Sequence, residues 1–135
     1  MIGENKENKD NTAYERTILY KNIYTQQKML YTMRTSVAKE ARYLLWKQCE
    51  ELSMELLMGV IPLTSVGDEE RLRQLAALDL KNEQLKVVIR LTYELKVIDS
   101  KKLVAIAQCI VDTGRMIGGW MKHIQKKDKR PARSA

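Results

Sequence analysis

Several ingredients of common catalytic and metal sites are scarce in this 135-residue chain, which has no phenylalanine, two prolines, two cysteines and one histidine. A di-iron helix bundle needs Glu-x-x-His pairs, whereas the single histidine, His123, lies near a basic terminus. Cys49 and Cys109 are isolated, without metal spacing or a nearby base, so we expect two buried thiols in a reducing compartment. The sequence therefore predicts no metal site, no cofactor and no catalytic residue, and we expect a protein that is not an enzyme.

Long apolar runs are also missing from the chain. No segment approaches the length that spans a membrane, and the polar start lacks the apolar core of a signal peptide. No alternating strand pattern and no hairpin dipeptide occurs. Gly118 and Gly119 continue a helical pattern and do not follow a strand, which argues against a phosphate-binding loop. We expect a cytoplasmic, helical protein without a membrane segment.

The length and composition fit one globular domain. Hydrophobic residues make up 44% and charged residues 30% of the chain, and the low proline content with abundant Leu, Lys, Glu, Gln and Met favours helix. Residues 1–11 are almost entirely polar, and we expect them to be disordered. The expected organisation is this disordered segment, a helical bundle over 12–127 and a basic flexible tail over 128–135.

Four segments carry apolar residues at helical spacing. Each begins with a capping residue or an acidic run: Thr12 with Glu15, Thr35 or Ser36, Asp68 with Glu69 and Glu70, and Asp99. In chain order, the positions expected to be buried are Ile18, Leu19, Ile23, Leu30 and Met33; Ala38, Ala41, Leu45, Cys49, Leu52, Leu56 and Val60; Leu72, Leu75, Ala76, Leu78, Leu85, Val88, Ile89, Thr92 and Leu95; and Leu103, Ile106, Ala107, Ile110, Val111, Gly114, Ile117, Gly118, Met121 and Ile124. Segments of about 23–29 residues form rods of roughly 35–43 Å, and such rods predict an all-α, antiparallel, up-down-up-down four-helix bundle.

A second row of side chains, Tyr20, Tyr24 and Tyr31, falls on another face of the first segment. Tyrosine covers the edge of a bundle well, and it is also favoured at subunit interfaces because one end of the ring tolerates water. Both interpretations stay open at this point. No aromatic-rich platform for single-stranded RNA is visible, so we expect little base recognition.

Positive charge is concentrated at the C-terminal end. Residues 115–135 contain seven basic side chains and one acidic side chain, so they supply six of the seven net positive charges. Such an end indicates a polyanionic partner, and a tail that only aids solubility is the alternative. Trp120, Met121 and Ile124 among the lysines also fit a membrane-surface helix, although the same residues continue the core stripe.

The fourth segment contains three glycines, Gly114, Gly118 and Gly119, directly before Trp120. A glycine inside a helix costs about 1 kcal/mol relative to alanine, and the close approach of another backbone is the usual reason to accept that cost. The approaching backbone belongs either to the same bundle or to another subunit. We expect Trp120 to anchor this junction and to fill space beside the glycines.

The third segment carries two basic residues, Lys86 and Arg90, which lie four positions apart and so share one exposed face. They are either ordinary surface charges or a binding pair.

The run from Gly114 to Trp120, GRMIGGW, followed by basic residues and preceded by RLTYELKVIDSKKL, resembles the C-terminal half of Avd, the accessory variability protein of diversity-generating retroelements. In that family a G-R-aliphatic-aliphatic-G-small-W segment precedes a basic tail on the last helix. The family also carries basic residues one turn apart on its third helix, and Lys86 and Arg90 stand in the matching stretch LKVVIRL. Lys86 replaces the usual arginine, which weakens a bidentate phosphate or carboxylate contact at this position.

The resemblance implies a four-helix bundle that assembles as a barrel-shaped homopentamer with a basic surface. It also implies binding to the retroelement's reverse transcriptase and, largely without sequence specificity, to its template RNA, in support of mutagenic copying. The residues expected to bind these partners are Lys86, Arg90, Arg115, Lys122, Lys126, Lys127, Lys129 and Arg130, and those expected to serve packing or assembly are Gly114, Gly118, Gly119 and Trp120. The alternative is a structural or regulatory protein of the ribosomal RNA intervening-sequence type, a similar bundle without a dedicated polymerase partner.

Overall fold

Helices account for all regular structure in residues 13–128, the part of the chain that the computed structural model describes. The first rod is α2 (Ile18–Met33). The second rod is formed by three consecutive pieces, which are α3 (Lys39–Ala41), the π-helical turn η3 (Arg42–Trp46) and α4 (Lys47–Val60). The third and fourth rods are α5 (Asp68–Glu94) and α6 (Ser100–Asp128). Short 3-10 turns precede or connect the rods: η1 (Ala13–Arg16), η2 (Arg34–Ser36) and η4 (Ile61–Ser65).

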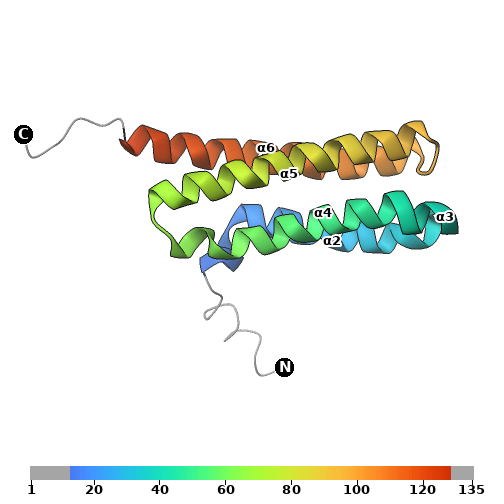
Figure 1. The fold of residues 1–135 in the computed structure, drawn as a ribbon, viewed down its shortest axis with the longest axis horizontal. Coiled ribbons are helices and arrows are strands. Elements are labelled where there is room, and N and C mark those ends of the chain that lie inside the picture. The colour runs from blue at the N-terminus through green and yellow to red at the C-terminus, as the bar shows by residue number, and fades with distance from the viewer. Residues whose placement is uncertain (1–12, 129–135) are drawn as a thin grey trace, which may run out of the picture.

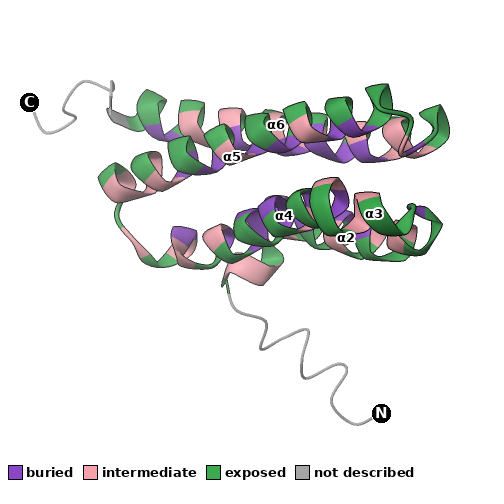
Figure 2. Ribbon diagram, turned by 45° about the vertical axis from the view of Figure 1, so that its right-hand side comes forward, coloured by how far each residue is buried: buried purple, intermediate pink, exposed green. Residues whose placement is uncertain are grey.

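Each rod packs against two others, in the order α2, α4, α5, α6 and back to α2. Successive rods run in opposite directions, and in Figure 1 the pair α5 and α6 lies above the pair α2 and α4. Buried residues face the interior between the rods, and exposed residues cover the outer sides (Figure 2). The all-α, antiparallel four-helix bundle expected from the sequence is confirmed.

The first rod begins later than the capping box of Thr12 and Glu15 predicts. Residues 13–16 form the 3-10 turn η1, and Thr17 caps α2 by accepting a hydrogen bond from the backbone N–H of Tyr20 at 3.1 Å. The Thr17 hydroxyl also donates to the Tyr14 carbonyl at 2.7 Å, which ties the turn to the helix. The predicted α-helical start is therefore wrong, and Thr12 itself lies outside the described residues.

The second rod also departs from expectation at its start. The hydroxyls of Thr35 and Ser36 donate to the carbonyls of Thr32 and Met33, so they close the first rod and do not cap the second. The second rod begins after Ala38 without a side-chain cap. Three residues later the chain enters the π-helical turn η3, which takes one more residue per turn than an α-helix and shifts the side chains that follow.

The fourth rod begins where the sequence predicts. The backbone N–H of Lys102 donates to Asp99 Oδ1 at 2.8 Å, and this bond is the main reason why the pKa of Asp99 lies below its usual value. Ile98 is buried in front of the cap, and Leu103 packs against the core, as the hydrophobic-staple arrangement requires.

Of the 31 positions predicted to be buried, 16 are buried, ten are half-buried and five are exposed. The predicted positions that are buried are Leu19, Ile23, Leu30, Cys49, Leu52, Leu56, Val60, Leu75, Leu78, Leu85, Ile89, Thr92, Ile106, Ile110, Ile117 and Ile124. The predicted positions that are exposed instead are Ile18, Ala38, Ala76, Leu95 and Val111. These errors lie at helix ends or at the margin of a stripe, where a small rotation about the helix axis moves a side chain into solvent.

Polar side chains link the rods inside the bundle. Asn22 donates to the Cys109 carbonyl at 3.0 Å and to Thr113 Oγ1 at 2.8 Å, which joins α2 to α6. The buried Gln26 donates to Ser53 Oγ at 2.9 Å, joining α2 to α4. Asn82, a polar interruption in the α5 stripe, is 4% exposed and donates to a carbonyl of α6. Because these bonds form in one register only, they favour a single alignment of the rods over shifted ones.

Both cysteines are free and buried. Burial raises the pKa of the Cys49 thiol to about 12, and burial also raises the pKa of Cys109. The thiols therefore stay protonated at neutral pH and behave as small hydrophobic side chains, as the sequence predicts.

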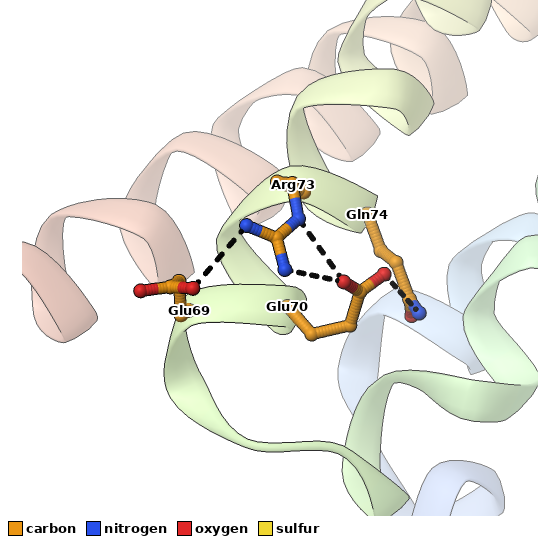
Figure 3. Close-up of polar contacts among 4 residues, drawn as sticks. All are labelled: Glu69, Glu70, Arg73 and Gln74. Atoms are coloured by element: carbon orange, nitrogen blue, oxygen red, sulfur yellow. Dashed lines mark hydrogen bonds and ion pairs between the residues drawn. The ribbon is translucent and has the colours of Figure 1, made fainter.

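The acidic start of α5 is held by ion pairs along the helix. Arg73 lies between Glu69 and Glu70, and two of its nitrogens donate to Glu70 Oε1 at 3.0 and 2.7 Å (Figure 3). The Arg73 side chain is the main cause that lowers the pKa of Glu70. This acidic turn faces the end of α6, where Lys127 Nζ lies 3.2 Å from Asp68 Oδ2.

Candidate partner-binding surfaces

Lys86 and Arg90 lie at a groove between α5 and α6. The groove has a volume of about 250 Å³, and its other lining residues are apolar: Ile89, Leu103, Ala107, Ile110 and Val111. Both basic side chains are exposed, and Lys86 Nζ lies 3.5 Å from Glu83 Oε1, which is a weak surface contact. The pair therefore presents two cations beside a small apolar depression, in a position where a partner can reach both.

An apolar stripe on the outer face of α5 adjoins this groove. Leu80, Val87 and Leu91 are 61%, 58% and 43% exposed, and their spacing of seven and four residues places them on one side of the helix, away from the core. Val104 and Val111 of α6 are also exposed. Glu83 and Gln84 lie between Leu80 and Val87 and interrupt the stripe. Exposed apolar residues on the outer face of a helix that is already packed on its other face are typical of a protein interface. The predicted core leaves these three α5 residues out, but the sequence pattern did not identify them as a surface stripe.

The glycine–tryptophan junction lies against the start of α2. Trp120 is half-buried and packs on the core, as expected of an anchor. A groove of about 710 Å³ opens beside it, lined mainly by apolar atoms of α2 and α6 and including Ile18, Gly119 and His123. Its volume is larger than that of the α5–α6 groove, and the exposed Ile18 lies on its α2 side.

The three glycines do not share one explanation. A Cβ added at Gly114 would lie 3.4 Å from Asn82 Nδ2, so this glycine makes room for the buried amide. A Cβ added at Gly118 or at Gly119 would meet no atom of the chain within 4 Å. Close packing inside the bundle is therefore the wrong explanation for Gly118 and Gly119, and a contact with another chain stays a prediction.

The α6 residues predicted to bind partners and described by the structure, Arg115, Lys122, Lys126 and Lys127, are exposed, but two of them have acidic neighbours. Arg115 lies 3.4 Å from Asp112 Oδ1, and Lys127 contacts Asp68 at the start of α5. Lys129 and Arg130 lie outside the described residues. This end of the bundle therefore combines positive charge from α6 with the acidic first turn of α5.

A family model described as bAvd-like matches residues 17–124, which include residues of all four rods. The chain belongs to the bAvd-like family. The resemblance inferred mainly from the C-terminal half is confirmed, and the match extends to the first two rods. No curated protein and no solved structure matches the chain.

The extent of the bAvd-like match separates the candidate residues into two groups. Lys86, Arg90, Arg115 and Lys122 lie inside it, together with the glycines and Trp120. Lys126, Lys127 and the tail follow its last residue. The α5–α6 groove is thus part of the bAvd-like domain itself, and the last basic residues follow that domain.

Membrane-spanning helices and metal sites are two further features to consider in the described residues. Among residues 13–128, none of the helices has the length and apolar character needed to cross a membrane. Within the same range, no group of three or more His, Cys, Asp or Glu side chains is arranged to hold a metal ion.

Proposed function

We propose that this bAvd-like protein is a non-catalytic accessory protein of a diversity-generating retroelement, acting in the cytoplasm. It holds the reverse transcriptase and the template RNA together and so supports mutagenic cDNA synthesis. The observation that carries the proposal is the family match over residues 17–124. The exposed pair Lys86 and Arg90 beside an apolar groove is in accord with it, because a protein partner would use the groove and RNA would use the charge.

The proposed assembly is a homo-oligomer, with the pentamer of the family as the expected form. The exposed stripe of Leu80, Val87 and Leu91 gives each chain an apolar surface that a second chain would cover. Assembly would also repeat each basic patch around a ring. Repetition raises the apparent affinity for a long polyanion well above that of one patch.

Two measurements on the purified protein test this proposal. The first is co-purification with the reverse transcriptase of the same retroelement, and a stable complex is expected. The second is RNA binding at increasing salt, where the affinity is expected to fall steeply because phosphate neutralisation releases counterions. Repeated failure to recover the complex would favour a bundle without a polymerase partner, as in the intervening-sequence type. RNA affinity that is independent of salt would contradict the electrostatic part.

Gly118 offers a separate test of assembly. We expect Gly118→Leu to keep the bundle folded, because open space surrounds the Cβ position and leucine is favoured over glycine in a helix by about 1 kcal/mol. We expect the oligomeric mass to fall, because the larger side chain would block the approach of a neighbouring chain. Light scattering measures the mass and circular dichroism the helicity. Gly118→Ala is the smaller matched substitution. An unchanged oligomeric mass of the leucine variant would show that no subunit contact forms at Gly118.

A further inference from the structure

The α2 side of the bundle carries basic residues without acidic residues nearby in the sequence. Residues 16–39 contain five lysines and arginines and no aspartate or glutamate. α2 lies inside this stretch, and its Lys21 and Lys28 are exposed. A helix without acidic side chains does not neutralise its own charge, so its surface attracts polyanions.

A groove of about 470 Å³ runs between α2 and α4 on this side. Tyrosines, methionines, a leucine, a glutamine and one lysine line it, and none of these lining residues is acidic. Tyr24 and Tyr31 are 43% and 63% exposed. The ring of Tyr20 stacks on that of Tyr24 with centroids 5.6 Å apart and planes 18° apart, which fixes the orientation of Tyr24. The groove thus presents aromatic surface that the bundle only partly covers.

Each exposed ring has a cation over it. Lys28 Nζ lies 5.1 Å from the centroid of the Tyr24 ring, and Arg34 Cζ lies 4.6 Å from that of Tyr31. Arg34 is held in place by Glu50, to which its Nε donates at 2.9 Å, and this hydrogen bond raises the pKa of the guanidinium further above its usual value. Lys28 lines the groove and has no acidic partner among residues 13–128, whereas Arg34 does not line it and is paired with Glu50. Exposed aromatic rings beside a cation are elements from which proteins build sites for single-stranded nucleic acid.

We propose that the α2–α4 groove binds single-stranded nucleic acid, with bases stacked on Tyr24 and Tyr31 and phosphates contacted by Lys28 and the nearby Lys21. This proposal depends on the proposed function in one respect, because the template RNA would be the natural polynucleotide that binds here. It places a further RNA contact on a different side of the bundle from the α5–α6 groove, in addition to the contact proposed for Lys86 and Arg90, because the pair α2 and α4 lies opposite the pair α5 and α6 (Figure 1).

The two rings are suited to single strands. Seven residues separate Tyr24 from Tyr31, which is about 10 Å along the helix axis at 1.5 Å per residue. A base stacks on a ring only through a free face, and neighbouring bases cover both faces of a base inside a regular duplex. Bases of a single strand can turn a free face to each ring.

The charge of the groove favours a polynucleotide over a protein helix as the occupant. An apolar helix laid over Tyr24 and Tyr31 would remove Lys28 from water, which is costly unless the partner supplies a matching acid. A phosphate backbone neutralises Lys28, while the bases stack on the tyrosine rings. One occupant then satisfies both the aromatic and the charged parts of the groove.

The test compares oligonucleotide binding by variants of the purified full-length protein. In Tyr24→Leu/Tyr31→Leu the affinity for a fluorescent single-stranded RNA oligonucleotide is expected to fall tenfold or more, since each base–aromatic stack contributes about 1–3 kcal/mol. The affinity for an abasic oligonucleotide of the same length and the slope of the salt dependence are expected to stay unchanged. Tyr24→Phe/Tyr31→Phe should bind like the parent protein. Tyr43→Leu is the matched control, because Tyr43 is 73% exposed and does not line the groove.

Three results would overturn the proposal. The first is an unchanged affinity of the leucine variant for the RNA. The second is a loss of affinity for the abasic probe that equals the loss for the RNA. The third is a leucine variant in which only the oligomeric mass changes, which would make the groove a protein interface. Co-purification with the reverse transcriptase separates this proposal from the proposed function. A leucine variant that still forms this complex and still binds RNA refutes the tyrosine site alone, whereas a parent protein that binds neither partner refutes the proposed function.

Discussion

Replacing Trp46 with alanine is expected to lower the free energy of unfolding by about 4 kcal/mol, the largest loss that we expect from a single substitution in this bundle. The side chain is fully buried, and it is the largest of the fully buried side chains. Its Nε1 donates to the Leu30 carbonyl at 3.0 Å, across the contact between the first and second rods. The substitution therefore removes packing and a hydrogen bond together, and a cavity remains where the ring was.

Guanidinium unfolding followed by circular dichroism measures this loss. Trp46→Phe separates the two contributions, because it keeps most of the ring and removes the donor, and we expect it to cost about half as much. Trp120→Ala is a second comparison, since Trp120 is only half-buried and should cost less than Trp46. A loss below about 1 kcal/mol for Trp46→Ala would mean that the second rod does not pack through this side chain.

Trp46 also shows where sequence periodicity fails. The predicted stripe of the second rod placed Ala38, Ala41 and Leu45 in the core at regular α-helical spacing, whereas Ala38 is exposed and the other two are only half-buried. The π-helical turn η3 inserts an extra residue into this part of the rod, and Trp46 then faces inward. From Cys49 onward no such insertion occurs and the predicted positions are correct. A pattern with a constant period cannot locate a local change of period.

The last rod is the opposite case. Its start follows from one residue, because Asp99 caps the helix through its own carboxylate and needs no distant contact to do so. Ile106, Ile110, Ile117 and Ile124 are then buried as the pattern requires. The start of α6 and its buried isoleucines both depend on residues close together in the sequence, so both could be predicted from it.

The candidate surfaces were only partly predictable. The exposure of Lys86 and Arg90 followed from their spacing, but the groove beside them depends on how α6 packs on α5. The pattern located the buried face of α5, but it did not identify the exposed Leu80, Val87 and Leu91 as a second, outer apolar face. The cation over Tyr31 comes from Arg34, which lies beyond the end of α2 in the turn η2. Because Arg34 follows Tyr31 by three residues, this contact is local, whereas the ion pair of Arg34 with Glu50 of α4 forms only in the folded chain.

Reversing the charge of Lys86 and Arg90 is expected to weaken partner binding strongly and to leave the fold intact. Both side chains are exposed, and the single weak ion pair of Lys86 contributes little to stability. For Lys86→Glu/Arg90→Glu we expect RNA affinity to fall about tenfold or more at moderate salt. If both cations contact phosphates of a single strand, the salt dependence should lose about 0.7 unit of slope per residue. Recovery of the reverse transcriptase complex should fall as well.

The matched control is Lys47→Glu/Lys101→Glu, which lowers the formal net charge from +7 by the same amount at two exposed positions outside the groove. Equal losses in the two variants would mean that only total charge matters, and the α5–α6 groove would then not be a specific site. Circular dichroism distinguishes a further outcome. A Lys86→Glu/Arg90→Glu protein with reduced helicity would show that the pair supports the fold. Unchanged helicity with lost binding would show that Lys86 and Arg90 contact the partner, because their charges then contribute to the interaction and not to the stability of the bundle.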